Sequence, residues 1–204
     1  MNRPDKVYNE QKLPTDNYKA TLYARNEGFY DFKINDYKTT FNEDKSEVTI
    51  TYDVTEGLQV KFGDTTFNGN VVFTNEELEE LVYYKKGKQF NQQKFDTTIR
   101  DIQEKYANKG YLRAEVIPEL TPAPAGTEEE DNLNITFNIR ENNIVYIDHI
   151  DITGEDATPK YIFAREIPLK EGDIFDYEKV QRGQNKLMNL GFLNDAQIDI
   201  TPTN

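Results

Sequence analysis

The stretch that decides the fold runs from Lys85 to Val116 and reads KKGKQFNQQKFDTTIRDIQEKYANKGYLRAEV. It predicts a tight turn, a long helix, a glycine stop and a strand, in that order. Asn91 stands where an N-cap residue accepts a backbone N–H of the first helical turn. Gly110 follows the last apolar position, where a left-handed residue commonly ends a helix. The apolar residues recur at steps of three or four, which places them on one helix face: Phe95, Ile99, Ile102 and Tyr106.

Parts of this stretch recur on both sides of it. Gly28, Gly110 and Gly191 each follow a predicted helix and precede an apolar or aromatic strand segment, and the intervals between them are nearly equal. Phe90 and Phe175 each follow a glycine turn, and a similar interval separates them. An interval of this size is longer than the repeat of a solenoid, and it indicates tandem small domains, each with its own core.

The predicted fold class is α+β. Each repeat has the order β-α-α-β-β, in which two antiparallel helices cover one face of a small three-stranded mixed sheet. Residues 1–57 are predicted to be the C-terminal half of a repeat, residues 58–142 a complete repeat, and residues 143–204 a repeat that lacks its last strand. We call these the first, central and third repeats. In the third repeat, Ile144–Thr153 and Asn194–Thr201 are predicted to be strands.

Composition excludes several classes of function. The net charge of −13 argues against nucleic acid as a partner, because nucleic-acid binding rewards clustered Lys and Arg. It also argues against docking on an anionic membrane surface. The chain has no Cys, so disulfides and thiolate chemistry are excluded. No run of 18 apolar residues is present, so the sequence predicts no membrane-spanning helix.

The order and recurrence of these motifs resemble the polypeptide-transport-associated (POTRA) repeats of outer-membrane assembly factors of the BamA type. No single motif is specific, but together they span essentially the whole chain. The segments that carry the resemblance are VTITYDVTEG at 48–57, VKF at 60–62, FNGN at 67–70, KGKQFN at 86–91, YANKGY at 106–111, IDHIDITG at 147–154 and NKLMNLGFL at 185–193.

The resemblance implies a location at the periplasmic face of the outer membrane of a diderm bacterium. It implies that a C-terminal membrane β-barrel of the parent chain, absent here, anchors the repeats. The implied partners are unfolded outer-membrane proteins and accessory periplasmic lipoproteins. The family implies no cofactor, no metal and no catalytic residue, so the chain is not expected to be an enzyme.

A three-stranded sheet leaves open edges, and an open edge offers unpaired N–H and C=O groups to another extended chain. Strand addition of this kind binds through the main chain and demands little of the guest sequence. The candidate edge for client binding consists of Arg113, Ala114, Glu115, Val116 and Ile117, with Asp31–Lys33 and Gln197–Asp199 as equivalents. The alternative is an ordinary edge, protected by its charges and by Pro118.

Two other clusters could bind a ligand. His149, the only histidine, stands on a predicted strand with Asp151 on the same face, and Glu128–Asp131 is a run of acids. A solvated histidine and a solvated loop are the favoured interpretations. The alternative function for the chain as a whole is a static scaffold or binding module of a secretion transporter or another envelope machine. Three repeats favour the assembly factor over the scaffold.

Overall fold

The computed structural model describes residues 8–154, 158–191, 193 and 195–201. The chain divides into two compact units. The first unit contains Met1–Thr66, Val82–Thr98 and Glu119–Thr136, and the second contains Phe67–Leu81, Ile99–Pro118 and Phe137–Asn204.

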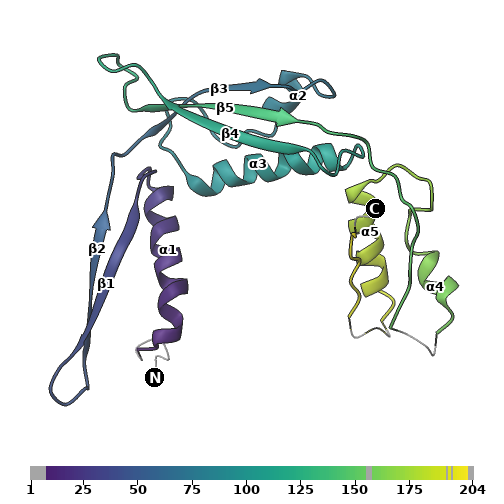
Figure 1. Ribbon diagram of the computed structural model, residues 1–204, viewed down its shortest axis with the longest axis horizontal. Helices are drawn as coiled ribbons and strands as arrows, with labels where there is room; N and C mark the ends of the chain where they lie inside the picture. The colour runs from purple at the N-terminus through teal and green to yellow at the C-terminus, as the bar shows by residue number, and fades with distance from the viewer. Residues whose placement is uncertain (1–7, 155–157, 192, 194, 202–204) are drawn as a thin grey trace. The chain divides into compact units, whose positions relative to one another are not determined.

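The first unit begins with a helix and a hairpin. The 3₁₀ turn η2 (Glu10–Lys12) leads into helix α1 (Leu13–Asn26), so the α-helix starts at Leu13, one residue before Pro14. Proline is tolerated there because the N–H groups of a first helical turn have no partner inside the helix. Strands β1 (Lys33–Phe41) and β2 (Val48–Thr55) follow as an antiparallel hairpin beside α1 (Figure 1).

The central repeat contains a sheet of three strands in the order β3-β5-β4 (Figure 1). Strand β3 covers Lys61–Asn68, β4 covers Glu115–Pro122 and β5 covers Asn132–Arg140. The last strand of the repeat therefore lies in the middle, and both β3 and β4 are edges. The predicted α+β fold class, a small three-stranded sheet with helices beside it, is thus confirmed.

Contacts between β3 and β5 show that these two strands are parallel. Thr66 contacts Thr136 at 3.0 Å between hydroxyl oxygens, and the Asn68 side chain donates to that of Asn138 at 3.3 Å. The residue numbers of the two pairs rise together along both strands, which is the pattern of a parallel pair.

Contacts between β4 and β5 show the opposite direction. The Ala123 N–H donates to the Asn132 carbonyl at 2.9 Å at one end of the pair, and Glu115 forms an ion pair with Arg140 at 3.5 Å at the other. The residue numbers rise along one strand as they fall along the other, so β4 and β5 are antiparallel. The sheet is mixed, as predicted.

Helix α3 (Gln92–Ala107) lies along the sheet (Figure 1), and α2 (Asn75–Glu79) contacts α3 where the Lys105 ammonium donates to the Glu77 carbonyl at 2.9 Å. The Thr74 side chain accepts from the Glu77 N–H at 3.3 Å, and the Glu77 carboxylate accepts from the Thr74 N–H at 2.9 Å, which is a capping box. Gly110 has a φ of +91°, and the Tyr111 N–H reaches back to the Tyr106 carbonyl at 3.0 Å. This is the left-handed helix end that the glycine predicted.

The core of the first unit is aromatic. Phe62 is 1% exposed, and its ring stacks on that of Tyr84 with centroids 3.8 Å apart and planes 9° apart. Phe90 lies against the same ring at 4.9 Å. Offset and tilted aromatic pairs add about 0.5–1.5 kcal/mol beyond the area that they bury. These rings join β3 to the segment that leads into α3.

Burial of Tyr84 predicts that the fold loses stability in alkali. Burial raises the pKa of the Tyr84 phenol to about 12, although a hydrogen bond donated by Thr65 at 3.3 Å acts in the opposite direction. In the unfolded chain a tyrosine titrates near pH 10. We expect the free energy of unfolding to be steady below about pH 10 and to fall between about pH 10 and pH 12, because only the unfolded state then releases the proton.

Urea unfolding at a series of alkaline pH values measures this dependence. Tyr84→Phe keeps the stacked ring and removes only the hydroxyl group, so it is expected to flatten the pH dependence of the free energy of unfolding. Tyr106, whose phenol pKa burial also raises, contributes to the decline and leaves a residual slope in this variant. An unchanged slope in Tyr84→Phe would show that the Tyr84 phenol is not held neutral by the fold.

The third repeat corrects one prediction. Helices α4 (Lys160–Ala164) and α5 (Tyr177–Met188) form, but neither Ile144–Thr153 nor the described part of Asn194–Thr201 is a ladder strand. Strands need partners, and in the central repeat β5 supplies them between β3 and β4. In segment 144–153, Tyr146 forms an isolated antiparallel bridge with Ile174 instead, and Val145 and Ile147 share backbone hydrogen bonds with residues 172–175.

Candidate functional site

Strand β4 presents a free edge in the central sheet. Because the Ala123 N–H donates to β5, Ala123 belongs to the row whose backbone faces β5. Alternation puts Ile117 in the same row and turns the backbone of Val116, Pro118 and Leu120 away from the sheet. Pro118 has no N–H to offer. The free edge therefore carries two outward N–H groups, at Val116 and Leu120, with a gap between them.

The first two residues of the predicted edge lie outside the strand. Strand β4 begins at Glu115, whereas the Ala114 N–H donates to the Tyr111 carbonyl at 3.0 Å in the turn after α3. The Arg113 carbonyl accepts from the Asn142 side chain at 2.6 Å. Arg113 and Ala114 thus have backbone groups that are already engaged. Of the five candidate residues, Glu115, Val116 and Ile117 belong to β4.

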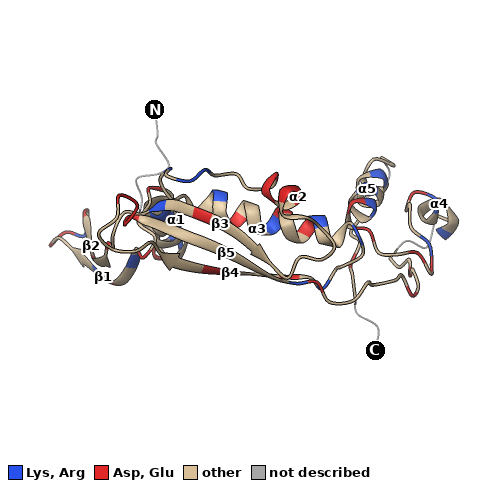
Figure 2. Cartoon of the chain, turned by 90° about the horizontal axis from the view of Figure 1, so that it is seen from above, with Lys and Arg blue, Asp and Glu red and all other residues tan. Residues whose placement is uncertain are grey.

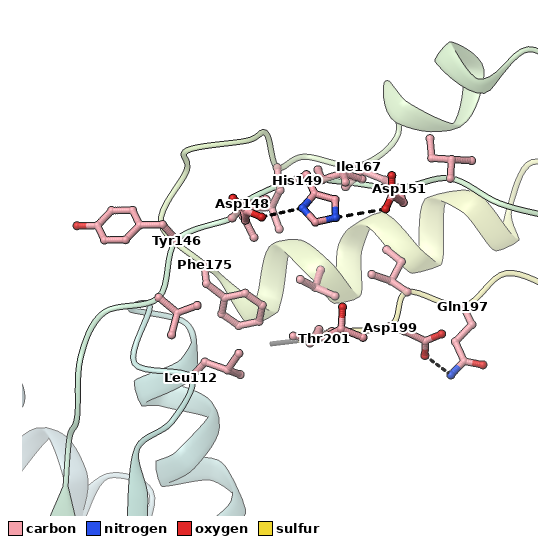
Figure 3. Close-up of a pocket in the computed structure, with 18 of the residues that line it drawn as sticks. Leu112, Tyr146, Asp148, His149, Asp151, Ile167, Phe175, Gln197, Asp199 and Thr201 are labelled. Atoms are coloured by element: carbon pink, nitrogen blue, oxygen red, sulfur yellow. Dashed lines mark hydrogen bonds and ion pairs between the residues drawn. The ribbon is translucent and has the colours of Figure 1, made fainter. Parts of the chain in front are cut away.

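A groove of about 1370 Å³ lies in the second unit (Figure 3). Its two walls are segments 144–153 and 195–201, and Leu112, Arg113 and Glu115 also line it. The helical side of the groove is apolar. The buried side chains that line it are Phe163, Leu169, Phe175, Val180 and Leu187.

His149 lies on one wall of the groove between two carboxylates (Figure 3). Its Nδ1 is 2.8 Å from Asp148 and its Nε2 is 3.3 Å from Asp151, so the predicted sharing of a face with Asp151 is confirmed. The hydrogen bond to Asp148, with the nearby Asp151 charge, raises the pKa of the imidazole. The His149 side chain is 52% exposed. Among the described residues, no group of three or more His, Cys, Asp or Glu side chains is placed so that it could hold a metal ion.

The remaining predicted positions belong to different elements of the chain. Asp31 precedes β1, and Lys33 is the first residue of that strand. The Gln197 amide donates to Asp199 at 2.6 Å on the second wall of the groove (Figure 3). In the acidic loop, Glu129 pairs with Lys86 at 3.0 Å. That carboxylate therefore has a cation within the protein.

The first helix of the central repeat, α2, is strongly acidic. Helix α2 carries acids along its short length, as Figure 2 shows: Glu76, Glu77 and Glu79, followed by Glu80. Helix α3 carries residues of both signs (Figure 2). No helix among the residues that the structure describes is both long and apolar enough to cross a bilayer.

Glu141 organises the end of β5, and sequence reasoning missed it. One carboxylate oxygen, Oε1, accepts from the backbone N–H groups of Val71 and Val72, both at 2.7 Å, and from the Tyr106 hydroxyl at 3.0 Å. Tyr106 is fully buried. Nothing in the local sequence distinguishes Glu141 from the many other acids, because its partners are 35 to 70 residues away.

Comparison with known proteins gives consistent matches. The family model described as POTRA, surface antigen variable number repeat, matches residues 2–57, 60–142 and 145–204. The outer membrane protein assembly factor BamA of Neisseria meningitidis is 31% identical over 199 residues, which are 96% of this chain and 24% of that protein. BamA of Nitratidesulfovibrio vulgaris is 26% identical over 201 residues, which are 97% of this chain and 25% of that protein.

A solved structure has the same fold. The crystal structure of Haemophilus influenzae BamA POTRA3-5 superposes with a TM-score of 0.83 at 22% identity, and the match covers 98% of this chain and 77% of that one. The chain spans about a quarter of the length of the curated relatives. The architecture predicted from the repeated motifs is confirmed by this superposition.

Proposed function

Because the chain belongs to the POTRA family, we propose that it is the periplasmic segment of a BamA-type outer-membrane assembly factor, which receives unfolded outer-membrane proteins by strand addition. In this proposal residues 1–57 and 143–204 are parts of POTRA domains, residues 58–142 are a whole one, and none is an enzyme. Docking of accessory periplasmic lipoproteins is part of the same proposal. The observation that carries strand addition is the free edge of β4.

The chemistry of that edge suits a client of variable sequence. A guest strand placed beside β4 would accept hydrogen bonds from the outward N–H groups of Val116 and Leu120, and would donate to the outward carbonyls. Main-chain groups are the same in every client, so this mode of binding does not select a sequence. Ile117 is 41% exposed and gives an apolar contact on the open face of the sheet.

The same geometry limits the strength of binding. A net hydrogen bond contributes about 0.5–1.5 kcal/mol, and Pro118 removes one donor from the middle of the outward row. Natural edges use proline in this way to prevent irreversible pairing. A receiver that must release its client benefits from such a gap, because a continuous edge would retain the strand.

Two substitutions at the edge are expected to change binding in opposite directions. Val116→Pro removes an outward donor and should weaken binding about tenfold, whereas Pro118→Val adds one and should strengthen binding several-fold. The ladder to β5 is untouched in both, because both residues face away from β5. The measurement is fluorescence anisotropy with a labelled synthetic peptide of alternating apolar and polar residues, the pattern of an outer-membrane strand.

Circular dichroism establishes first that both variants are folded. Val116 is buried, so Val116→Pro carries a risk of unfolding, and Pro118→Val keeps the test decisive in that event. A matched control is Thr121→Val on the same strand, which keeps β propensity and leaves every backbone group unchanged. Equal peptide affinity in the wild type, Val116→Pro and Pro118→Val would show that β4 is not the receiving edge and would favour a static scaffold.

A further inference from the structure

The end of α1 meets the start of the central repeat through two backbone N–H groups. The Asn26 side-chain oxygen accepts from the N–H of Gln93 at 3.0 Å. The carbonyl of Gly28, two residues later, accepts from the N–H of Val60 at 2.9 Å. The first bond reaches the N-terminus of α3, and the second reaches the segment that leads into β3. All four residues lie within the first compact unit.

The end of α3 meets the start of the third repeat in the same way. The Asn108 side-chain oxygen accepts from the N–H of Glu178 at 2.9 Å, and the carbonyl of Gly110 accepts from the N–H of Val145 at 2.8 Å. These four residues lie within the second compact unit. One common interval along the chain separates both acceptors from their counterparts, and a second common interval separates both donors from theirs. The chain therefore builds one contact twice.

Each Asn side chain completes the capping of the next repeat's helix. A helix begins with N–H groups that have no partner inside it. In α3 the local N-cap, Asn91, bonds the N–H of Lys94, which leaves that of Gln93 for Asn26. In α5 the local N-cap bonds the N–H of Lys179 and leaves that of Glu178 for the preceding repeat. The two local caps are Asn91 and Asp176, and the two caps from the preceding repeat are Asn26 and Asn108.

Close packing explains why a glycine follows each of these asparagines. A Cβ on Gly28 would lie 2.9 Å from Cγ of Gln89 and 3.0 Å from Cγ of Gln59, and one on Gly110 would lie 2.5 Å from Cγ2 of Ile174. Both glycines also have positive φ, +90° and +91°. The glycine therefore ends the helix and lets the next repeat approach.

We propose that the Asn-X-Gly ends of α1 and α3 are docking joints, each of which holds the first segment and the long helix of the next repeat together. The joint opens as one event, so losing the helix contact also releases the contact to Val60 or Val145. This property is independent of what β4 binds. It makes Asn26 and Asn108 the residues through which one repeat stabilises the next.

Native-state hydrogen exchange followed by NMR tests the joint in the 204-residue chain. Asn26→Ala is expected to speed exchange of the Gln93 amide and of the Val60 amide together, by about tenfold, the equivalent of one lost hydrogen bond. The Lys94 amide, which has its own cap, should change little. Asn26→Asp keeps an acceptor oxygen next to the positive end of α3 and should restore protection at both amides.

Asn189 gives a matched control. Asn189-Leu190-Gly191 repeats the same motif at the end of α5, but no described atom lies within 4 Å of a Cβ built on Gly191. Asn189→Ala should leave the amides of Gln93, Val60, Glu178 and Val145 unchanged. Acceleration of the Gln93 amide alone in Asn26→Ala would overturn the proposal, because the contact would then be a cap without a joint. No acceleration at either amide would also overturn it.

Discussion

Phe62→Ala is expected to lower the free energy of unfolding of the central repeat by about 3–5 kcal/mol, the usual cost of removing a buried phenylalanine ring. Phe62 is 1% exposed, and its ring contacts those of Tyr84 and Phe90. The substitution would leave a cavity between β3 and the segment that enters α3. Backbone hydrogen bonds join the two elements, so they have little freedom to move together and close the cavity.

Backbone bonds at the same residue define what the substitution leaves intact. The Phe62 N–H donates to the Lys88 carbonyl at 2.8 Å, and the Phe62 carbonyl accepts from the Gly87 N–H at 2.7 Å. Urea unfolding followed by circular dichroism measures the loss. Leu58→Ala is the control, because Leu58 is 82% exposed and its truncation should cost less than about 0.5 kcal/mol. Similar losses in both variants would contradict the aromatic core described for the first unit.

Local chemistry explains which features could be predicted from the sequence. Asn91 and Asp176 cap their helices, and Gly110 ends α3, because each acts on backbone groups within a few residues of itself. The order of strands and helices within each repeat followed from local helix and strand signals, and the interval between the repeats indicated tandem domains.

Features that depend on distant partners could not be predicted. Segment 144–153 has the alternation of a strand, but alternation does not provide the neighbouring strands of a ladder, and the segment forms only the isolated bridge between Tyr146 and Ile174. The outward direction of Val116 depends on the register of β4 against β5, which the sequence of β4 alone does not determine. Asn26 and Asn108 looked like ordinary helix ends, since their donors lie 67 and 70 residues further along the chain.

Glu141→Ala is expected to lower the free energy of unfolding by about 3 kcal/mol, although Glu141 belongs to no apolar core. The substitution removes the acceptor of the Val71 and Val72 N–H groups and of the buried Tyr106 hydroxyl. A buried donor left without an acceptor costs about 1–3 kcal/mol, and hydrogen bonds to a charged group are the stronger ones. Because Glu141 ties the loop after β3 to α3, the same variant should speed amide exchange at Val71 and Val72.

A double-mutant cycle separates the hydroxyl from the two backbone bonds. Tyr106→Phe removes the group that Glu141→Ala would leave unpaired, so the double variant should be less destabilised than the sum of the two single variants, with a coupling of about 0.5–3 kcal/mol. Glu141→Gln keeps a neutral acceptor oxygen and should lose about half as much stability as Glu141→Ala. Strict additivity would place the Tyr106 hydroxyl outside the network. The loss remaining in the double variant would then measure how far two backbone bonds to one carboxylate hold the loop after β3 against the sheet.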